Sequence, residues 1–406
     1  MPTCELVTIG SELLNGAVLN TNAQFLAREL SRLDFEVVHQ ASCRDREEEM
    51  VDTLAAACRR SDLIIATGGL GPTPDDITRQ AVARLFRCGL RFDPGQYRLI
   101  VAHFRKLSRT TPFMTRREAF LPEVAKPLLN RFGIALGFYV YRGGKLLIVL
   151  PGVPMELVRM FDESVQSLIC RVFRKRSKRY GVEAQIAGLY ETQIMRKLGG
   201  SFFKGRVFDF GIYPEVGQVT VRIKAQNKAL ISTLRRELAK KLKPYIYSFQ
   251  GQTLSQVIGE MLRRRAKTLS VAESCTGGLL AARVTDSSGA SRYYKGGVVA
   301  YSNEAKRRYL NISSKLLSTR GAVSPETARA MASGVRHQFR TSIGVAVTGI
   351  AGPTGGSRTK PVGLVYIAIS DDRRTRVFQW RFLGDREKVR LQATQKALFC
   401  LWQWLL

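Results

Sequence analysis

Histidine and paired cysteines are scarce in this chain of 406 residues. It contains three histidines and seven cysteines, and no two cysteines form a C-x-x-C pair. Because protein zinc sites are built from closely spaced cysteine and histidine ligands, this composition argues against a zinc centre. An odd number of cysteines without a secretion signal is typical of the reducing cytosol. We therefore expect most of the cysteines to be small core residues.

Long apolar runs are also missing. Runs such as residues 146–150 stop well short of the roughly 20 apolar residues that cross a bilayer. The first five residues lack the charged-then-apolar order of a signal peptide. These features predict a cytoplasmic protein that makes no membrane contact. A length of 406 residues predicts two or three domains.

Acidic side chains are about half as numerous as basic ones. The chain has 33 Asp plus Glu and 64 Lys plus Arg, a net charge of +31, and residues 171–250 alone hold 18 basic and 5 acidic side chains. Such a field attracts nucleic acids, nucleotides and phosphorylated metabolites. The densest run, residues 171–179, is equally typical of a solvated linker or helix face. Charge therefore leaves a nucleic-acid- or partner-binding protein open as an alternative to an enzyme that acts on acidic substrates.

Strands alternate with helices at the start of the chain. Apolar patterns predict strands at residues 3–9, 35–39 and 62–66 and helices at residues 21–33 and 47–59. This alternation predicts a parallel sheet covered by helices, which binds ligands beyond the carboxyl ends of its strands. A further strand at residues 146–150 and a helix at residues 156–172 complete a first domain, residues 1–172.

The rest of the chain is also α/β. A strand at residues 218–224 and a helix at about residues 230–243 predict a small, basic α+β module, residues 173–250. A third domain, residues 251–406, combines predicted strands at residues 268–272, 297–300, 343–347 and 362–369 with helices at residues 254–265, 325–336 and 387–404. The predicted fold class is thus α/β, with a small α+β module in the middle.

A glycine-rich stretch follows the third predicted strand. It holds Gly68, Gly69 and Gly71 and leads to the adjacent carboxylates Asp75 and Asp76. Glycines at a strand end let backbone N–H groups approach phosphates, and two carboxylates can hold Mg²⁺ against a pyrophosphate. A tight connection would use the same glycines, so that interpretation stays open. Three more stretches at strand ends could line the same crevice, namely residues 10–22, 130–138 and 150–156.

These segments resemble the molybdopterin-binding fold in the version found in the CinA (competence/damage-inducible) family. In that family the domain is associated with hydrolysis of the pyrophosphate of ADP-ribose. The resemblance implies a divalent metal such as Mg²⁺ on Asp75 and Asp76, and a phosphate site formed by Thr67, Gly68, Gly69, Gly71, Asn20, Asn130 and Gly152. The family pattern Asn-Pro-x-Gly-Thr-Ala-Pro-Gly-Phe differs here at Ile134 and Leu136. Loss of a hydroxyl there leaves binding without catalysis as an alternative.

A second glycine-rich turn, residues 273–278, follows the predicted strand at residues 268–272 and opens a helix. Its sequence is Glu-Ser-Cys-Thr-Gly-Gly, with Ser274 in second place. A serine at such a turn is held at the strand edge, where N–H groups of the helix start can stabilise an oxyanion. Serine is also a good helix cap, and that alternative stays open.

A serine nucleophile needs a base, and the three histidines are poorly placed for this role. Two fall in the first domain and the third lies in an ordinary basic helix. The other candidate is a lysine that loses its proton through burial and cationic neighbours. Lys306 lies just beyond the predicted strand at residues 297–300, with Arg307 and Arg308 beside it, and Arg386 or Arg390 could approach it. A surface lysine in a charged helix would show the same pattern.

Two more stretches complete this region. Thr348 and Gly349 end a predicted strand in a loop of small residues that suits close approach of a ligand. Arg390, early in the last helix, could clamp a phosphate bidentately. In this order, the four motifs resemble the C-terminal domain of the CinA family, a family of nicotinamide mononucleotide deamidases, over about residues 253–397.

The resemblance implies hydrolysis of an amide without metal or other cofactor. Ser274 would attack the carboxamide of nicotinamide mononucleotide, Lys306 would be the base, and Tyr301 would position or relay the proton. Contacts with the nucleotide would come from Thr276, Gly277, Thr348, Gly349 and Arg390. Nicotinic acid mononucleotide and ammonia would be released.

The resemblance also bears on partners. The family tends to dimerise, which implies a homodimer, and its middle piece has a KH-like fold. Residues 181–250 contain no G-x-x-G loop, so clamping of nucleic acid in the KH manner is not supported.

Overall fold

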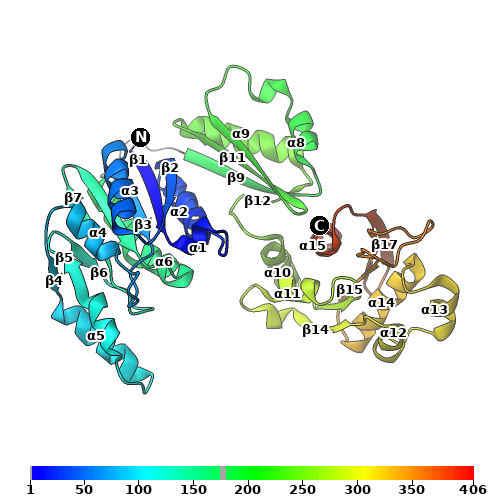
Figure 1. The fold of residues 1–406 in the computed structure, drawn as a ribbon. Helices are drawn as coiled ribbons and strands as arrows, with labels where there is room; N and C mark the ends of the chain where they lie inside the picture. The colour runs from blue at the N-terminus through cyan, green and yellow to red at the C-terminus, as the bar shows by residue number, and fades with distance from the viewer. Residues whose placement is uncertain (1, 174–179) are drawn as a thin grey trace. The chain divides into compact units, whose positions relative to one another are not determined.

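The structure, a computed structural model, describes residues 2–173 and 180–406. They form two compact units, Met1–Lys178 and Arg179–Leu406 (Figure 1). Both combine helices with sheets, which confirms the predicted α/β class. Within the described ranges, no helix is long and apolar enough to cross a membrane. Most of the basic run at residues 171–179 lies outside the described residues.

The first unit is built on a six-stranded sheet in the order β2-β1-β3-β8-β7-β6. Strands β2, β1, β3 and β8 are parallel, and β7 and β6 add antiparallel neighbours. The central strand β3 is buried along its whole length, as a sheet covered on both faces requires. The strand bounds are β1 Thr3–Ile9, β2 Glu36–Cys43, β3 Leu63–Thr67, β6 Lys126–Leu128, β7 Gly137–Arg142 and β8 Lys145–Leu150.

Helices cover both faces of this sheet (Figure 1). Leu63 and Ile65 of β3 pack in one apolar cluster with α2 (Thr21–Arg32), α6 (Pro154–Met160), η2 (Phe161–Val165) and α7 (Gln166–Val172). Ile64 and Ala66 pack in the other cluster with α3 (Glu47–Arg60) and α4 (Thr78–Leu85). The remaining elements are α1 Ser11–Leu14, β4 Leu90–Phe92, α5 Pro94–Lys106, η1 Phe113–Ala119 and β5 Phe120–Pro122.

The second unit contains a five-stranded sheet in the order β14-β13-β15-β16-β17, in which β14, β13 and β15 are parallel. One face packs on α10 (Leu254–Arg264), α11 (Leu279–Thr285) and α15 (Arg386–Leu405). The other face packs on α12 (Asn303–Leu310), α13 (Ser314–Arg320) and α14 (Pro325–Gln338). The strand bounds are β13 Leu269–Glu273, β14 Tyr294–Val299, β15 Ile343–Gly349, β16 Leu364–Ser370 and β17 Thr375–Arg381, with η4 at Ala290–Arg292.

The middle module belongs to the second unit. Its antiparallel sheet, in the order β10-β11-β9-β12, is covered by helices α8 and α9. Ala187 and Tyr247 of the module are part of the apolar cluster around α15, and the ring of Tyr247 lies 6.2 Å from that of Trp402. The structure thus divides into two compact units, and the division into three domains stays a prediction. The bounds are β9 Tyr180–Ala187, α8 Glu191–Leu198, η3 Gly200–Phe202, β10 Asp209–Glu215, β11 Gln218–Ala225, α9 Lys228–Leu242 and β12 Ile246–Ser248.

Candidate active site

The carboxyl ends of β14, β13 and β15 meet at one edge of the second unit's large sheet, and Ser274 lies at the centre of that edge. Its backbone N–H donates to the Val347 carbonyl of β15 at 2.9 Å. On the other side, the Ala300 N–H donates to the Glu273 carbonyl at 2.8 Å. Because strands flank it on both sides, the backbone at Ser274 is fixed by the sheet.

Lys306 reaches Ser274 from the first turn of α12. The Ser302 hydroxyl caps this helix by accepting from the Ala305 N–H at 3.0 Å. The Lys306 Nζ donates to Ser274 Oγ at 3.1 Å, to the Ala300 carbonyl at 2.8 Å and to the Tyr301 carbonyl at 3.2 Å. Its side chain is only 1% exposed. Lys306 is therefore a buried amine in contact with the serine, and the surface-lysine alternative is wrong.

Burial lowers the pKa of Lys306 to about 8, because the charged form loses its hydration there. The sequence-based expectation also invoked cationic neighbours. That cause is corrected, since Arg307 and Arg308 point into solvent and burial accounts for the lowered pKa. A substantial fraction of the amine is neutral near pH 8, as a general base requires.

The turn after Ser274 is shaped by two consecutive glycines with left-handed backbone angles, Gly277 at φ 57° and Gly278 at φ 96°. Gly278, not Ser274, caps α11, so the helix-cap alternative for the serine is wrong. The Glu273 carboxylate accepts from the N–H groups of Gly278 and Leu280, both at 3.0 Å, and of Ala281, at 2.8 Å. This corrects the expected oxyanion site at the helix start, because those N–H groups are already occupied.

Two other N–H groups at the turn remain available. In the described part of the chain, the amides of Cys275 and Thr276 donate to no other residue, and the buried Thr276 hydroxyl has no partner either. Burial raises the pKa of the Cys275 thiol to about 12, which keeps it protonated and unreactive. The sequence pattern could not distinguish these two free amides from the occupied ones.

Tyr301 contributes its carbonyl rather than its hydroxyl to the lysine. The Arg386 guanidinium donates to the Tyr301 hydroxyl at 2.6 Å and to the Gly352 carbonyl at 2.9 Å. The tyrosine is 58% exposed. The contact of its carbonyl with Lys306 fits the expected positioning role, whereas its hydroxyl contacts Arg386 and a proton relay through it stays a prediction.

The other predicted contact residues of this region surround the turn. Arg390 donates to the Thr276 carbonyl at 3.1 Å and lies beside Gly277. Thr348 is fully buried and its hydroxyl donates to the Ala322 carbonyl at 2.8 Å, so it ties the end of β15 to the loop between α13 and α14. Gly349 lies against the Leu364 carbonyl of the neighbouring strand. Of these residues, Arg390 is the one whose side chain contacts the Ser274 turn.

The glycine-rich stretch of the first unit is packed tightly. Gly68 has a left-handed φ of 110°, and a Cβ there would overlap the Ile9 carbonyl. A Cβ at Gly69 would overlap the Thr78 hydroxyl, and one at Gly71 would press on the Asp76 carboxylate. The buried Thr67 hydroxyl donates to the Pro151 carbonyl at 2.8 Å. These contacts show that the stretch is a tight connection, whatever else it binds.

The two predicted asparagines also serve the backbone. Asn20 caps α2 by accepting from the Ala23 N–H at 3.0 Å. Asn130 accepts from the N–H groups of Phe132 and Gly133, at 3.0 and 3.1 Å, and donates to the Glu156 carboxylate at 2.6 Å. Both side chains therefore shape the loops that carry them, which makes them poor candidates for direct phosphate contacts.

Asp75 and Asp76 were the predicted metal ligands. Asp75 is exposed, and Asp76 accepts hydrogen bonds from the Thr73 N–H, at 2.9 Å, and hydroxyl. Among the described residues, no group of three His, Cys, Asp or Glu is arranged to hold a metal. The pair fits a divalent metal only if phosphate oxygens of a ligand complete its coordination. Gly152 lies beside Gly68, whose Cα would be 3.5 Å from an added Cβ.

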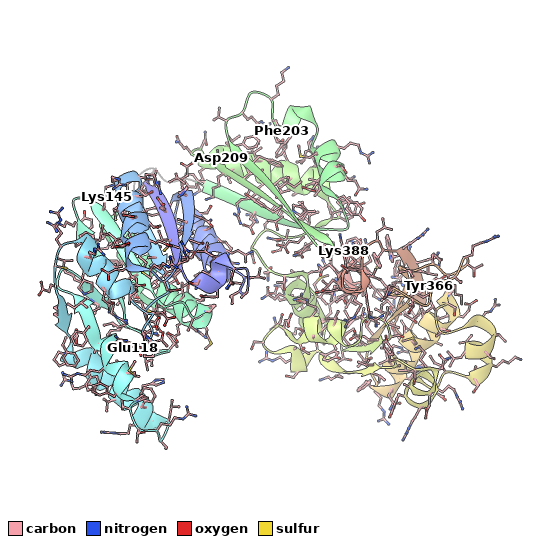
Figure 2. The ribbon with its side chains drawn as sticks, viewed as in Figure 1. Glu118, Lys145, Phe203, Asp209, Tyr366 and Lys388 are labelled. Atoms are coloured by element: carbon pink, nitrogen blue, oxygen red, sulfur yellow. The ribbon has the colours of Figure 1, made fainter. Side chains whose placement is uncertain are left out.

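Sequence reasoning missed Glu118, which Figure 2 labels in the first unit. It is fully buried, and in the described part of the chain neither carboxylate oxygen has a hydrogen-bond partner. Burial raises the pKa of Glu118 to about 7, against the opposing effect of Arg79, while Asp76 and Glu156 raise it further. A glutamate beside two arginines in sequence looks exposed, so no sequence signal could have found it.

Comparison with known proteins places the chain in a family. The family model described as CinA C-terminal domain matches residues 251–405, and the one described as probable molybdopterin binding domain matches residues 5–170. A protein from Halothermothrix orenii that carries the name competence-damage inducible protein is 38% identical over 99% of this chain and 98% of its own length. The chain belongs to the CinA family.

Two further known proteins are similar to this chain. A CinA-like protein from Kosmotoga olearia is 36% identical over 97% of both chains. The crystal structure of a competence/damage inducible protein from Agrobacterium tumefaciens is 40% identical, covers 37% of this chain and 92% of its own, and has a TM-score of 0.36. These names state the family and do not state a reaction.

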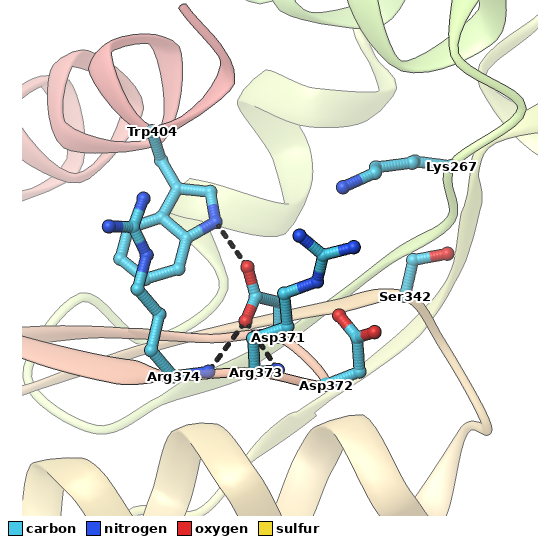
Figure 3. A pocket seen from close by; sticks show the side chains of 7 residues that line it. All are labelled: Lys267, Ser342, Asp371, Asp372, Arg373, Arg374 and Trp404. Atoms are coloured by element: carbon cyan, nitrogen blue, oxygen red, sulfur yellow. Dashed lines mark hydrogen bonds between the residues drawn. The ribbon is translucent and has the colours of Figure 1, made fainter.

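A separate cavity of about 840 Å³ lies at the opposite edge of the large sheet, where β13 and β15 begin (Figure 3). The Asp371 carboxylate there accepts from the Trp404 indole N–H at 3.1 Å and from the backbone of Arg373 and Arg374. The Arg374 guanidinium stacks 4.3 Å over the Trp404 ring. These groups hold a turn together and include none of the predicted site residues.

Proposed function

We propose that the second unit hydrolyses the carboxamide of nicotinamide mononucleotide to nicotinic acid mononucleotide and ammonia. The observation that carries this proposal is the buried contact of 3.1 Å between Lys306 Nζ and Ser274 Oγ. A serine paired with a neutral lysine is an acyl-transfer catalyst that needs no histidine. The choice of nucleotide rests on the resemblance of residues 253–397 to the deamidases of the CinA family.

The first half of the reaction forms an acyl-enzyme. In its neutral form, Lys306 keeps two N–H groups for the carbonyls of Ala300 and Tyr301, and its lone pair faces Ser274. The lone pair accepts the serine proton while Oγ bonds to the carboxamide carbon. The N–H groups of Cys275 and Thr276 are the available donors for the oxyanion.

The second half returns the enzyme to its starting state. The Lys306 ammonium gives its proton to the departing nitrogen, the carbon–nitrogen bond breaks and ammonia leaves. Water then loses a proton to the neutral Lys306 and attacks the ester carbon, and the lysine returns this proton to Ser274 Oγ as the ester bond breaks. Each proton taken by Lys306 is thus returned within the same half-reaction.

Two arginines at the start of α15 give the site its preference for an anionic substrate. Arg390 contacts the Thr276 carbonyl at 3.1 Å and Arg386 spans Tyr301 and Gly352. A guanidinium can bind a phosphate bidentately, so Arg390 is our choice for the phosphate of the nucleotide.

Release of ammonia from nicotinamide mononucleotide tests this proposal. We expect turnover by the wild type and a loss of at least about 1,000-fold in Ser274→Ala. Ser291→Ala, an exposed serine of the same unit, is the matched control and should retain its rate if the effect is specific to the dyad. Equal rates in wild type and Ser274→Ala would overturn the assignment.

For the first unit we propose binding of a pyrophosphate nucleotide such as ADP-ribose with a divalent metal on Asp75 and Asp76. The carboxylates of Asp75, which is exposed, and of Asp76, which is partly exposed, support this, since they can share a metal with ligand phosphates. Metal-dependent loss of ADP-ribose that disappears in Asp76→Ala would support hydrolysis. Binding without turnover would assign the crevice to recognition only. Dimerisation and nucleic-acid binding remain predictions of the resemblance and of the charge.

A further inference from the structure

Glu273 is a buried carboxylate directly before the nucleophile, and the proposed mechanism gives its side chain no role. Its side chain is 1% exposed, and it makes no ion pair in the described part of the chain. Its two oxygens accept from three N–H groups of the start of α11, at 2.8 to 3.0 Å. The partial positive charge of these helix-start amides is thus its counter-charge.

The backbone of the same residue is anchored on both sides. The Glu273 carbonyl accepts from the Ala300 N–H, next to β14, and the following residue, Ser274, donates to Val347 of β15. The side chain adds a third attachment, to α11. Since one residue joins two strand ends and a helix, any shift of α11 would be felt at Ser274.

We propose that Glu273 is a positioning residue for Ser274. By occupying the amides of Gly278, Leu280 and Ala281, it fixes the turn and leaves the amides of Cys275 and Thr276 to face the oxygen of the substrate. This inference rests on the proposed function, because it assumes that Ser274 is a nucleophile.

The chemistry of the side chain explains why a carboxylate is needed. Three donors converge on two oxygens, and an ionised carboxylate offers acceptor sites on both. Glutamine offers one acceptor oxygen, and its NH₂ group would face a backbone N–H. Aspartate keeps both oxygens but is shorter by one methylene, so it cannot reach all three amides without movement of the turn.

The test compares Glu273→Gln and Glu273→Asp with the wild type by two readouts. One is the rate at which a small fluorophosphonate labels Ser274, which needs no nicotinamide substrate. The other is kcat and KM for nicotinamide mononucleotide. The labelling rate and kcat are both calculated per folded molecule, with the folded fraction taken from thermal unfolding curves. We expect labelling and kcat to fall about 100-fold in Glu273→Gln, with KM changed less than about threefold, since misplacement by about 1 Å costs that much. Glu273→Asp should recover part of the loss.

Glu326→Gln is the matched control, because Glu326 is a partly exposed glutamate in the first turn of another helix of this unit, where it pairs with Arg320. It should label and turn over at the wild-type rate. Labelling of Glu273→Gln at the wild-type rate per folded molecule would overturn the proposal and assign Glu273 to folding alone. If the wild-type protein is labelled at Ser274 but releases no ammonia, the proposed substrate is wrong, and the comparison of the Glu273 variants by labelling stays valid. No labelling of the wild type would overturn both.

Discussion

Two glycine-rich turns follow buried central strands, one in each unit, and they use their polar groups differently. After β3, the Thr67 hydroxyl and the Gly68 N–H donate to neighbouring carbonyls, and both asparagines of the surrounding loops accept from backbone N–H groups. After β13, Ser274 contacts a buried amine, and the amides of Cys275 and Thr276 donate to no other residue in the described part of the chain. Because the amides of Gly69 and Gly71 likewise have no acceptor in the described part of the chain, the two turns differ in the buried amine that contacts Ser274.

Buried ionisable groups show the same contrast. Burial lowers the pKa of Lys306 and raises the pKa of Glu118, and both shifts favour the neutral form of the side chain. Lys306 has a reactive partner at 3.1 Å, whereas the oxygens of Glu118 have no hydrogen-bond partner among the described residues. A perturbed pKa marks a candidate site only when geometry supplies the second group.

Lys306→Met should have the largest effect on the difference between the two turns, because it nearly keeps the length of the side chain and removes the amine. We expect ammonia release to fall at least about 1,000-fold, because Ser274 loses its base. The protein should stay folded, since a buried amine is replaced by an apolar group. Lys315→Met, at an exposed position on α13, should behave as the wild type. A rate within about tenfold of the wild type would show that another group is the base.

The pH dependence of kcat/KM sharpens the role of the lysine. With a pKa of about 8, the neutral amine is about one-hundredth of the total at pH 6 and about one-half at pH 8. Activity should therefore rise roughly tenfold per pH unit from pH 6 and level off above pH 8. Assays of ammonia release in buffers of constant ionic strength measure this. A flat profile between pH 6 and pH 8 would contradict Lys306 as the base.

Glu118→Gln tests whether the buried carboxyl of the first unit only destabilises the folded protein. Its pKa in the folded protein is raised to about 7, above the unfolded value, so the unfolded state releases the proton first as pH rises. Stability is therefore lost between about pH 4.5 and pH 7, and glutamine removes that loss. At pH 8 we expect the variant to be more stable on the order of 2 kcal/mol, with little difference at pH 4.5.

Chemical unfolding at the two pH values measures the effect of Glu118→Gln, and Glu163→Gln, an exposed glutamate, is the control. A loss of stability at pH 8 would mean that the ionised carboxylate is attracted by Arg79 more than burial penalises it.

Much of the fold and the heart of the candidate site could be predicted from the sequence. Apolar alternation located the strands, and the carboxyl ends of parallel strands meet at one edge, which brought Ser274 and Lys306 together. Boundaries were less accurate: β14 begins at Tyr294, three residues before the predicted start. Strand ends are set by pairing with β13, which a single-sequence pattern does not show.

The direction of side chains could not be predicted. Periodicity gives no reason for the Tyr301 hydroxyl to turn to Arg386, or for Glu273 to turn back onto α11. Both depend on rotamers chosen by partners more than eighty residues away or across a turn. The Thr348 hydroxyl is a third case, because the Ala322 carbonyl that accepts from it belongs to a loop between two helices.

Gly152→Ala has the smallest expected effect on stability, so it can test whether the first glycine-rich turn binds a ligand as well as connecting β3 to α4. An added Cβ would meet only the Gly68 Cα, at 3.5 Å, so stability should change by less than about 0.5 kcal/mol. Gly68→Ala, by contrast, should be strongly destabilised, because its left-handed φ and the Ile9 carbonyl leave no room. If phosphates lie over this loop, the methyl group of Gly152→Ala will weaken binding of Mg²⁺–ADP-ribose roughly tenfold in calorimetry. Unchanged binding by a folded variant would place the ligand elsewhere and leave the first turn a structural connection.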